Sequence, residues 1–520
     1  MHDIRSRAAV IAVLALAGSA AVWSFQTAPP TGPTSAAPSA RTAARGSTAA
    51  NRSRFLEMFA RSYFPGRSGQ IMVVPREGDI ITRDEPDIRY MHGSPWPYDT
   101  AIPMFFVGKA IRPGSYPVPA VQQDVAATIA AVLQAAMPPS ASGRVLPIIR
   151  PGVAAPRAVF LLVLDGMRPD YFSRYAKELP TLTALRKRSA WMSAARVNTL
   201  PTNTAVGHAT IATGAPPGVH GVTGNNVYDR TKKGRHDTFD GFDPRDLVVP
   251  NLADVWQLQT AGRAIVIAQG SSIPASVAMA GHGGCQLNGT KVTHSGYDDR
   301  TGRWRTGDTC FVQPASIAEL DARTLWPADG LWMGHKIDTP SGVRRSGLFP
   351  QFEADAFARL LESQQIGQDD VTDLLFLNYK GADYVGHKHG PESRELAATF
   401  EEMDRHLARI LRVIEEKTGG DYLLAVTADH GMPSEPPAGG THRHFAPQIV
   451  DLLHKQFDPE GRTLVPYYEP ENAQIFVDRD RLAALKLTLE DMARFLQQQP
   501  FMFAAYPEDE VRRAASRLPR

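Results

Sequence analysis

The sequence predicts an α/β fold with a mostly parallel central sheet, helices on both faces of the sheet, and an inserted cap. Three observations support this class. Short apolar runs typical of buried strands alternate with longer stretches of helical spacing. Several of the apolar runs end in an aspartate, and one long stretch rich in Gly and Asp interrupts the alternation. With 520 residues and 43% apolar content, the chain is large enough for an extensive core.

Seven apolar runs are expected to form strands: 70–75, 102–108, 158–166, 263–270, 373–379, 422–431 and 473–478. Helical spacing predicts helices over 120–137, 251–262 and 395–417. Strands that alternate with helices favour parallel pairing with both faces of the sheet covered. Residues 226–350 are richer in Gly, Asp and turn residues, so we expect them to form the cap.

The N-terminus is typical of an exported protein. Residues 1–25 contain two arginines followed by an apolar run and small residues, which predicts a secretory signal peptide. An uncleaved membrane anchor is the alternative, although the run is short for a full span. Residues 26–53 are rich in Ala, Pro, Thr and Ser and predict a disordered linker. The remainder, 54–520, is expected to be a single catalytic domain in the periplasm or outside the cell.

Charge and cysteine content narrow the function classes. The formal net charge is +2, which does not favour a nucleic-acid partner. Apart from the signal segment, no stretch predicts a stable membrane span, and the oligomeric state is left open. Cys285 and Cys310 are the two cysteines. In an oxidising compartment we expect them to form a disulfide, with two free buried thiols as the alternative.

Acidic residues follow three of the expected strands. Asp165 ends one strand, Asp429 ends another, and Asp383 lies shortly after a third. Ligands in open α/β sheets bind beyond the carboxyl ends of the strands, so the three carboxylates predict a cation site. A single such aspartate would more simply cap a helix. His387 lies four residues after Asp383, and His430 follows Asp429 directly; mixed Asp/His ligation suits zinc.

A Thr- and Gly-rich stretch, "NTLPTNTAVGHATIATGAPPGVHGVTGN", covers residues 198–225. A polar turn before a helix is suited to presenting a side chain and backbone N–H groups to an anion, and a helix cap is the alternative. Taken with the aspartates, the chain resembles the alkaline phosphatase superfamily, especially its nucleotide pyrophosphatase/phosphodiesterases and its alkaline phosphatases with a threonine nucleophile. The motifs that carry the resemblance are Thr204, His208, Thr213-Gly214, His220-Gly221 and Asn225, followed by "LDG", "GAD…GHKHG" and "TADHG".

The resemblance implies a phosphoric ester hydrolase with two zinc ions, or two other divalent ions, acting on a small phosphate-ester substrate. Thr204 would attack phosphorus and form a phosphothreonine, and Asn225 would bind the phosphoryl group. One metal site would comprise Asp165, Thr204, Asp429 and His430. The other would comprise Asp383, His387 and a third histidine.

In the family, this third histidine comes from a segment near the C-terminus. Here the matching segment, "YMHGSPWPYDTAIPMFFVGKAIRPGSY", lies near the N-terminus and contains His92. We therefore hypothesise a circular permutation that moves residues 54–148 from the end of the domain to its front, with 157–225 and 355–520 as the core. Permutation requires native termini that lie close together, which predicts that Arg54 is near Arg520. His442 and His444 are the competing ligands.

Substrate charge is the remaining question. Threonine-type alkaline phosphatases bind the monoester dianion with an added Lys and Arg. Alignment on Ala280-Gly281-His282 puts Ser272 and Pro274 at these positions. The resemblance therefore favours a phosphodiester or a nucleotide pyrophosphate as substrate. Monoester hydrolysis is the alternative if Lys232, Lys233 or Arg235 supplies a positive charge to the site in place of the missing Lys and Arg. A non-enzymatic binding protein would be expected to lose metal ligands, and none is missing if His92 counts.

Overall fold

The computed structural model describes residues 40–518 except 86, 286–291 and 435–442. The expected signal peptide, 1–25, and His442 lie outside these residues. The chain divides into Met1–Ala50 and a compact unit, Asn51–Arg520, which contains everything described below. Helix α1, Ala40–Ser62, covers the end of the segment expected to be a disordered linker, so that prediction is wrong from residue 40 onward. Alanine and arginine in this stretch are good helix formers, and they outweigh its polar composition.

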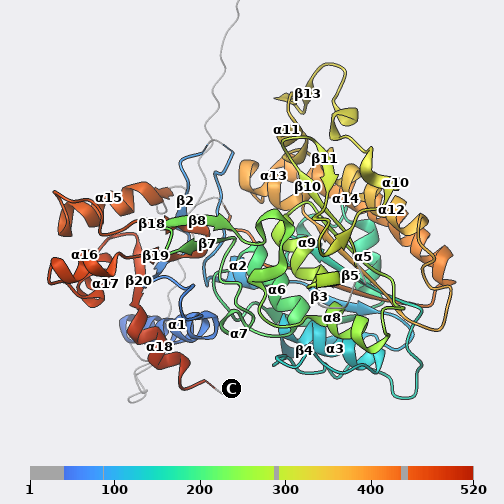
Figure 1. The fold of residues 1–520 in the computed structure, drawn as a ribbon, viewed down its shortest axis with the longest axis horizontal. Helices are drawn as coiled ribbons and strands as arrows, with labels where there is room; N and C mark the ends of the chain where they lie inside the picture. The colour runs from blue at the N-terminus through green and yellow to red at the C-terminus, as the bar shows by residue number, and fades with distance from the viewer. Residues whose placement is uncertain (1–39, 86, 286–291, 435–442, 519–520) are drawn as a thin grey trace, which may run out of the picture. The chain divides into compact units, whose positions relative to one another are not determined.

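A ten-stranded mixed sheet organises the unit (Figure 1). Its strands have the order β11-β10-β9-β15-β5-β16-β3-β6-β4, with β12 beside β10. The central strands β9, β15, β5 and β16 are parallel, whereas β3 runs antiparallel to both β16 and β6. The strands of this sheet are β3 Met104–Val107, β4 Gly114–Val121, β5 Ala158–Leu164, β6 Ala190–Arg196, β9 Val266–Gly270, β10 Val292–Asp298, β11 Arg303–Arg305, β12 Phe311–Val312, β15 Asp373–Tyr379 and β16 Tyr422–Thr427.

A second, four-stranded antiparallel sheet has the order β18-β19-β1-β20. Its strands are β1 Ile71–Pro75, β18 Tyr467–Glu469, β19 Gln474–Phe476 and β20 Met502–Pro507. All seven apolar runs predicted from the sequence contain a strand, but two of them, β1 and β19, belong to this second sheet. The N-terminal segment is thus part of both sheets, with β1 between β19 and β20 and β3 between β16 and β6.

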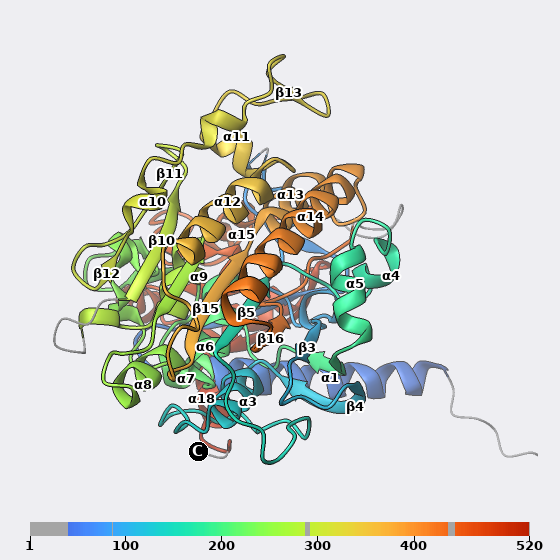
Figure 2. The same ribbon diagram turned by 90° about the vertical axis from the view of Figure 1, so that its right-hand side faces the viewer.

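Helices cover the large sheet in two layers (Figure 2). In one layer α12 packs along α14, which also contacts α5 and α13; in the other α6 packs against α3 and α9. The described helices are α1, α2 Pro97–Thr100, α3 Gln123–Leu133, α4 Tyr171–Arg174, α5 Pro180–Lys187, α6 Thr204–Thr213, α7 Pro217–His220, α8 Leu252–Gln259, α9 Ile273–Ala280, α10 Ala315–Ala318, α11 Pro340–Arg344, α12 Phe349–Glu362, α13 Gly381–His389, α14 Arg394–Thr418, α15 Ala446–Phe457, α16 Arg479–Ala484, α17 Leu489–Gln497 and α18 Glu508–Ala515. Among the described helices, none combines the length and apolarity needed to span a membrane.

The segment 226–350, expected to be a cap, is only partly one. Its strands β9 and β10 extend the large sheet. The apolar run 263–270 predicts β9, whereas β10 was not predicted because its sequence, VTHSGYD, is largely polar. Short hairpins, β7–β8 (Asn226–Asp229 and Gly234–Asp237) and β13–β14 (Leu331–Trp332 and His335–Lys336), lie outside the sheet. Cys285 and Cys310 of this segment are joined by a disulfide.

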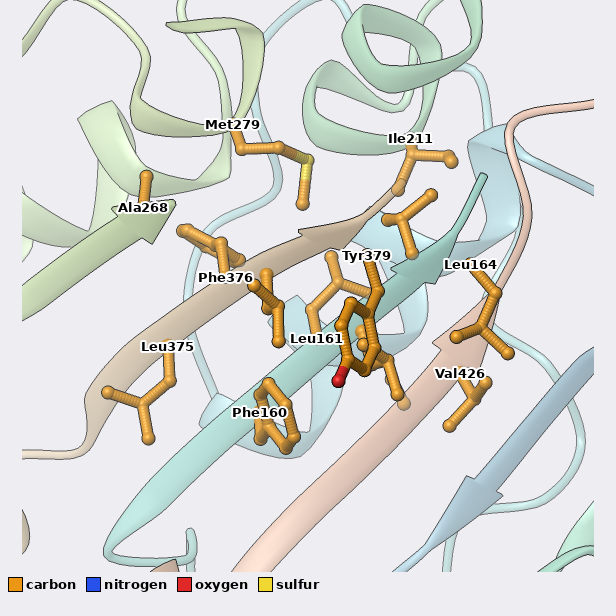
Figure 3. Close-up of a cluster of buried hydrophobic side chains, with 14 of the residues drawn as sticks. Phe160, Leu161, Leu164, Ile211, Ala268, Met279, Leu375, Phe376, Tyr379 and Val426 are labelled. Atoms are coloured by element: carbon orange, nitrogen blue, oxygen red, sulfur yellow. The ribbon is translucent and has the colours of Figure 1, made fainter. Parts of the chain in front are cut away.

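The central strands are buried on both faces, as parallel strands between helices must be. Figure 3 shows side chains of β5, β15 and β16 packed together, among them Phe160, Phe376 and Val426. Ile211 of α6 and Met279 of α9 close over one face of this group. The strands are therefore fixed relative to one another by apolar burial, and so are the residues that follow their carboxyl ends. Two short strands, β2 Ile80–Thr82 and β17 Arg443–Phe445, pair beside this framework.

Candidate active site

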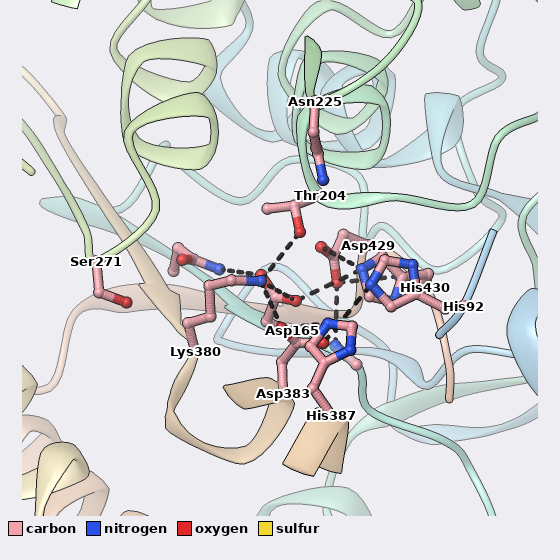
Figure 4. A network of polar contacts seen from close by, with 12 residues as sticks. His92, Asp165, Thr204, Asn225, Ser271, Lys380, Asp383, His387, Asp429 and His430 are labelled. Carbon is pink, nitrogen blue, oxygen red and sulfur yellow. Dashed lines mark hydrogen bonds and ion pairs between the residues drawn. The ribbon is translucent and has the colours of Figure 1, made fainter. Parts of the chain in front are cut away.

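One edge of the large sheet gathers acidic and histidine side chains (Figure 4). Asp165 directly follows β5 and Asp429 follows β16 by two residues, while Asp383 and His387 lie one turn apart on α13. The structure brings together every residue expected to bind metal: His92, Asp165, Thr204, Asp383, His387, Asp429 and His430. Because the central strands are parallel, their carboxyl ends meet at this edge, which is why residues far apart in sequence converge.

Asp165, Asp429 and His430 form the first cluster. The Nε2 atom of His430 lies 3.5 Å from Oδ1 of Asp165 and 3.3 Å from Oδ2 of Asp429. Suitable ligand atoms of all three side chains lie within 4.8 Å of one another. All three are buried, so two carboxylates are held close together away from water. Burial and the nearby Asp165 raise the pKa of Asp429 well above its ordinary value, because both disfavour a second negative charge there.

Asp383, His387 and His92 form the second cluster. The Nε2 atom of His387 lies 3.4 Å from Asp383 Oδ2, and that of His92 lies 3.9 Å from Asp383 Oδ1. The imidazole of His92 also stacks on that of His430, with ring centres 3.6 Å apart. His444, one of the competitors for the third histidine position, instead stacks on Phe501 and faces Asp79.

The three histidines share one orientation. Each places its Nδ1 atom against a backbone carbonyl oxygen. The distance is 2.7 Å from His92 to Thr202, 2.6 Å from His387 to Tyr90, and 2.8 Å from His430 to Gly431. Because a carbonyl oxygen only accepts, Nδ1 carries a proton, and Nε2 is the ring atom that faces the carboxylates. Metal-binding histidines are oriented by hydrogen bonds of this kind. Burial, together with His430 and His387, holds the pKa of His92 well below its ordinary value, so its ring is neutral, as a ligand must be.

The two clusters fit divalent cations. Asp383 Oδ1, Asp429 Oδ2 and His430 Nε2 are buried and have no hydrogen-bond partner within the described part of the chain. Buried polar atoms are normally satisfied, so unpartnered ones that face each other require a ligand. Carboxylate oxygens mixed with imidazole nitrogens are a donor set suited to zinc.

Thr204 is the first residue of α6, and it follows Asn203, whose side chain caps the helix by accepting from the Val206 N–H. Its neighbour Ala205 donates its N–H to Oδ1 of Asn225 at 2.9 Å. This bond turns the Asn225 amide nitrogen toward Thr204, as Figure 4 shows, and the same nitrogen donates to Glu471. A hydroxyl, a helix N-terminus and an amide donor are thus grouped at one point.

Two histidines of the Thr- and Gly-rich stretch have supporting positions. His208 Nδ1 lies 2.8 Å from the carbonyl oxygen of Thr204, and His208 Nε2 lies 3.0 Å from the amide nitrogen of Asn378. His220 pairs with the hydroxyl of Thr210 at 3.1 Å. These contacts hold α6 in place against its neighbours and explain why the motif contains more histidines than the metal clusters use.

Lys380 was missed by the sequence reasoning and lies at the centre of the site. Its ammonium nitrogen is 3.0 Å from the Thr204 hydroxyl, 2.8 Å from Asp165 and 2.7 Å from Asp383. Although burial alone would lower it, Asp165 and Asp383 raise the pKa of Lys380 well above its ordinary value. A signal for it existed, because Lys380 directly follows a buried strand, as Asp165 does.

The cleft above Thr204 is lined by both Ser272 and Pro274, so the two positions expected to lack a charge do face the site. Of the cations considered as replacements, Arg235 lines the same cleft and donates to Asn226 at 3.0 Å. Lys233 is exposed and pairs with Asp478 at 3.3 Å. Lys232, also exposed, lies 3.8 Å from Asp229. Arg235 and Lys380 therefore line the cleft, together with Arg83, Arg344 and Arg345, whereas Lys232 and Lys233 do not.

The fold and the site together define an α/β protein with a threonine beside two clusters of side chains that could hold metal ions. The family model for type I phosphodiesterase/nucleotide pyrophosphatase matches residues 159–497. The chain belongs to this family of phosphoric ester hydrolases, as the resemblance predicted.

Similar proteins include alkaline phosphatases. Alkaline phosphatase PafA of Elizabethkingia meningoseptica is 27% identical over 417 residues, covering 69% of this chain and 76% of the relative. Alkaline phosphatase PhoV of Synechococcus elongatus is 27% identical over 400 residues, covering 66% and 71%. The crystal structure of wild-type PafA has the same fold, with a TM-score of 0.53 at 24% identity over 67% of this chain and 78% of that one. The chain is alkaline phosphatase-like in both sequence and fold.

Proposed function

We propose that the chain is an exported hydrolase with two divalent metal ions, zinc by preference, that cleaves small phosphate esters through a phosphothreonine on Thr204. The observation that carries the proposal is the position of the Thr204 hydroxyl, which lies beside the Lys380 ammonium at 3.0 Å, next to the carboxylates of both clusters. Export is supported by the sequence of residues 1–25.

In the proposed reaction the Thr204 oxygen attacks phosphorus in line with the ester oxygen that leaves. The P–O bond to the leaving group breaks as the bond to Thr204 forms, and the hydroxyl proton is lost. Asn225 donates a hydrogen bond to a non-bridging phosphoryl oxygen. Water then cleaves the phosphothreonine, which releases phosphate or a monoester and restores Thr204.

The metal ions would be held by Asp165, Asp429, His430 and Thr204 on one side and by Asp383, His387 and His92 on the other. When bound, two such ions stabilise the attacking and leaving oxygens of an in-line displacement. The backbone carbonyls behind His92, His387 and His430 keep the three imidazoles oriented for this role.

A circular permutation explains how His92 reaches the site. The family model begins only at residue 159, after the whole segment that contains His92. That segment supplies β1 and β3 to the interiors of both sheets. Its beginning lies against the end of the domain, because Tyr506 donates to the Arg52 carbonyl at 2.8 Å and Tyr63 donates to Glu508 at 2.7 Å. Arg520 is outside the described residues, so its closeness to Arg54 stays a prediction. The contacts of Arg52 and Tyr63 with Tyr506 and Glu508 nevertheless support a domain whose two ends lie side by side, as a permutation requires.

Two substrate classes remain, and different observations favour each of them. Ser272 and Pro274 leave two cleft positions without charge, which favours phosphodiesters or nucleotide pyrophosphates. Lys380 and the similarity to alkaline phosphatases favour monoesters, whose dianion needs more positive charge. Following the two uncharged positions, we propose diester or pyrophosphate substrates first and monoester hydrolysis as the second candidate.

Initial rates of the zinc-loaded protein with bis-p-nitrophenyl phosphate and p-nitrophenyl phosphate test this proposal, with Thr204→Ala as the blank. We expect hydrolysis of both, a preference for the diester, and no turnover above background in Thr204→Ala. A preference for the monoester would overturn the order of the two candidates. Activity that survives in Thr204→Ala would overturn the mechanism.

A further inference from the structure

Lys380 is a full positive charge in contact with the proposed nucleophile, and the reaction steps described above assign it no contact with the substrate. Its side chain is buried beneath the cleft, and its nitrogen is within 3.0 Å of Thr204, Asp165 and Asp383 at once. In Figure 4 it approaches Thr204 from the side opposite His92 and His430. A buried lysine is costly unless its charge is used or compensated, so its placement needs an explanation.

The backbone around Lys380 is held rigidly. Glu353 of α12 accepts the Lys380 N–H at 3.1 Å through one carboxyl oxygen and the Gly381 N–H at 3.2 Å through the other. Ser271 donates to the same carboxyl group at 3.0 Å. The ammonium also lies 5.2 Å from the ring centre of Tyr384, which limits its movement on that side. The contacts of its backbone with Glu353 and of its ammonium with Tyr384 therefore direct the lysine toward Thr204.

A phosphoryl group attacked by Thr204 must bring its oxygens close to the threonine oxygen. A cation 3.0 Å from that oxygen is then within hydrogen-bonding reach of a non-bridging phosphoryl oxygen. We infer that Lys380 binds the phosphoryl group from beneath the cleft, in place of the charges absent at Ser272 and Pro274, and so determines how well the site accepts a monoester dianion. The inference rests on the proposed function and specifies its substrate range.

The alternative role for Lys380 is to neutralise Asp165 and Asp383 without touching substrate. The two roles differ in what a neutral replacement does. A monoester carries one more negative charge at phosphorus than a diester does, so loss of a substrate-binding cation penalises the monoester more. Loss of a cation that only compensates the carboxylates or Thr204 penalises both substrates alike.

The experiment compares Lys380→Met with the wild-type metal-loaded protein and with Lys233→Met, a control in which the lysine is exposed and pairs with Asp478. For Lys380→Met we expect kcat/KM for p-nitrophenyl phosphate to fall about 10- to 100-fold, and roughly tenfold less for bis-p-nitrophenyl phosphate. Calorimetry should show binding of inorganic phosphate weakened about tenfold, with metal content unchanged. Lys233→Met should match the wild type in all respects.

Equal losses for the two substrates, a fall in metal content, or unchanged phosphate binding in Lys380→Met would each overturn the inference. A changed substrate ratio in Lys233→Met would overturn it as well, because the charge would then come from elsewhere. If methionine prevents folding, Lys380→Gln retains a hydrogen-bond donor beside Thr204 and is expected to shift the ratio in the same direction. Thr204→Ala separates this test from the proposed function, since activity in that variant contradicts the mechanism whatever Lys380 does.

Discussion

The two clusters of candidate metal-binding side chains are built in different ways. The first, Asp165, Asp429 and His430, comes from residues that follow two parallel strands in the middle of the sheet. The second combines α13, which carries Asp383 and His387, with a loop of the N-terminal segment that carries His92. Sheet topology alone brings the first cluster together. The second depends on a segment that lies before the part of the chain matched by the family model.

The difference shows what fixes a ligand in each case. Asp165 and Asp429 cannot move without disturbing strands that are buried on both faces. The loop of His92 is held by hydrogen bonds instead. Thr202 donates its hydroxyl to the Ser94 carbonyl at 2.9 Å and accepts the Gly93 N–H at 3.1 Å, while its own carbonyl accepts from His92. Thr202 thus anchors the loop that carries His92 to the segment that leads into α6.

The largest expected effect is at Thr204. Thr204→Ala removes the proposed nucleophile, so we expect kcat to fall by several orders of magnitude, because the covalent step is lost. Thermal unfolding should change little, since Asn203 rather than Thr204 caps α6. Stopped-flow or steady-state rates at saturating substrate measure the effect, with Thr210→Ala on the same helix as a structural comparison. A fall of less than tenfold would contradict the assignment.

A smaller effect is expected from a change at Thr202, which anchors the loop that carries His92. Thr202→Val keeps the shape of the side chain but loses both hydroxyl hydrogen bonds, so His92 becomes less well oriented. Loss of a group that orients a ligand typically costs about 10- to 100-fold in metal affinity. Chelator competition measures that affinity. Thr339→Val, which removes a helix cap in the 226–350 segment, is the matched control and should leave metal affinity unchanged.

Loss of the disulfide should lower the stability of the protein and leave its activity unchanged. Cys285 and Cys310 are 25 residues apart in sequence and lie in the 226–350 segment, which contains none of the predicted metal ligands. Replacing both with serine should lower the free energy of unfolding by roughly 3.5 kcal/mol, the chain-entropy value for a loop of this size. Denaturant titration measures the loss. Metal content and kcat under native conditions should be retained, and a loss of bound metal would show that this segment supports the clusters after all.

The smallest effect is expected from reversing the permutation. A chain in which residues 51–151 are moved behind residue 518 through a Gly/Ser linker keeps every contact between the N-terminal segment and the two sheets. Exposed loops tolerate such rearrangement. We expect folding, metal binding and rates within a few-fold of the original. Far-ultraviolet circular dichroism and the diester assay check this, and failure to fold would contradict the proposed joining of the ends.

The same contrast separates what the sequence could predict from what it could not. The strands, and the aspartates that follow them, were predictable because buried parallel strands have a clear apolar signature and a common carboxyl edge. His92 has no local pattern of its own, and only resemblance to the family pointed to it. Lys380 directly follows a strand, as Asp165 does, but a positively charged side chain does not match the cation site that the neighbouring carboxylates predict. The pairing of β1 with β19 and β20 is a long-range contact that periodicity cannot indicate.

Bound metal in His92→Ala tests the central claim most directly, because that claim is that the N-terminal segment completes a metal site built by the rest of the chain. Elemental analysis after zinc loading and buffer exchange should give one metal ion fewer per chain in His92→Ala than in the wild type. His442→Ala and His444→Ala should equal the wild type. Full metal content in His92→Ala, with a deficit in either of the other two variants, would contradict the account and give the second cluster a different third ligand.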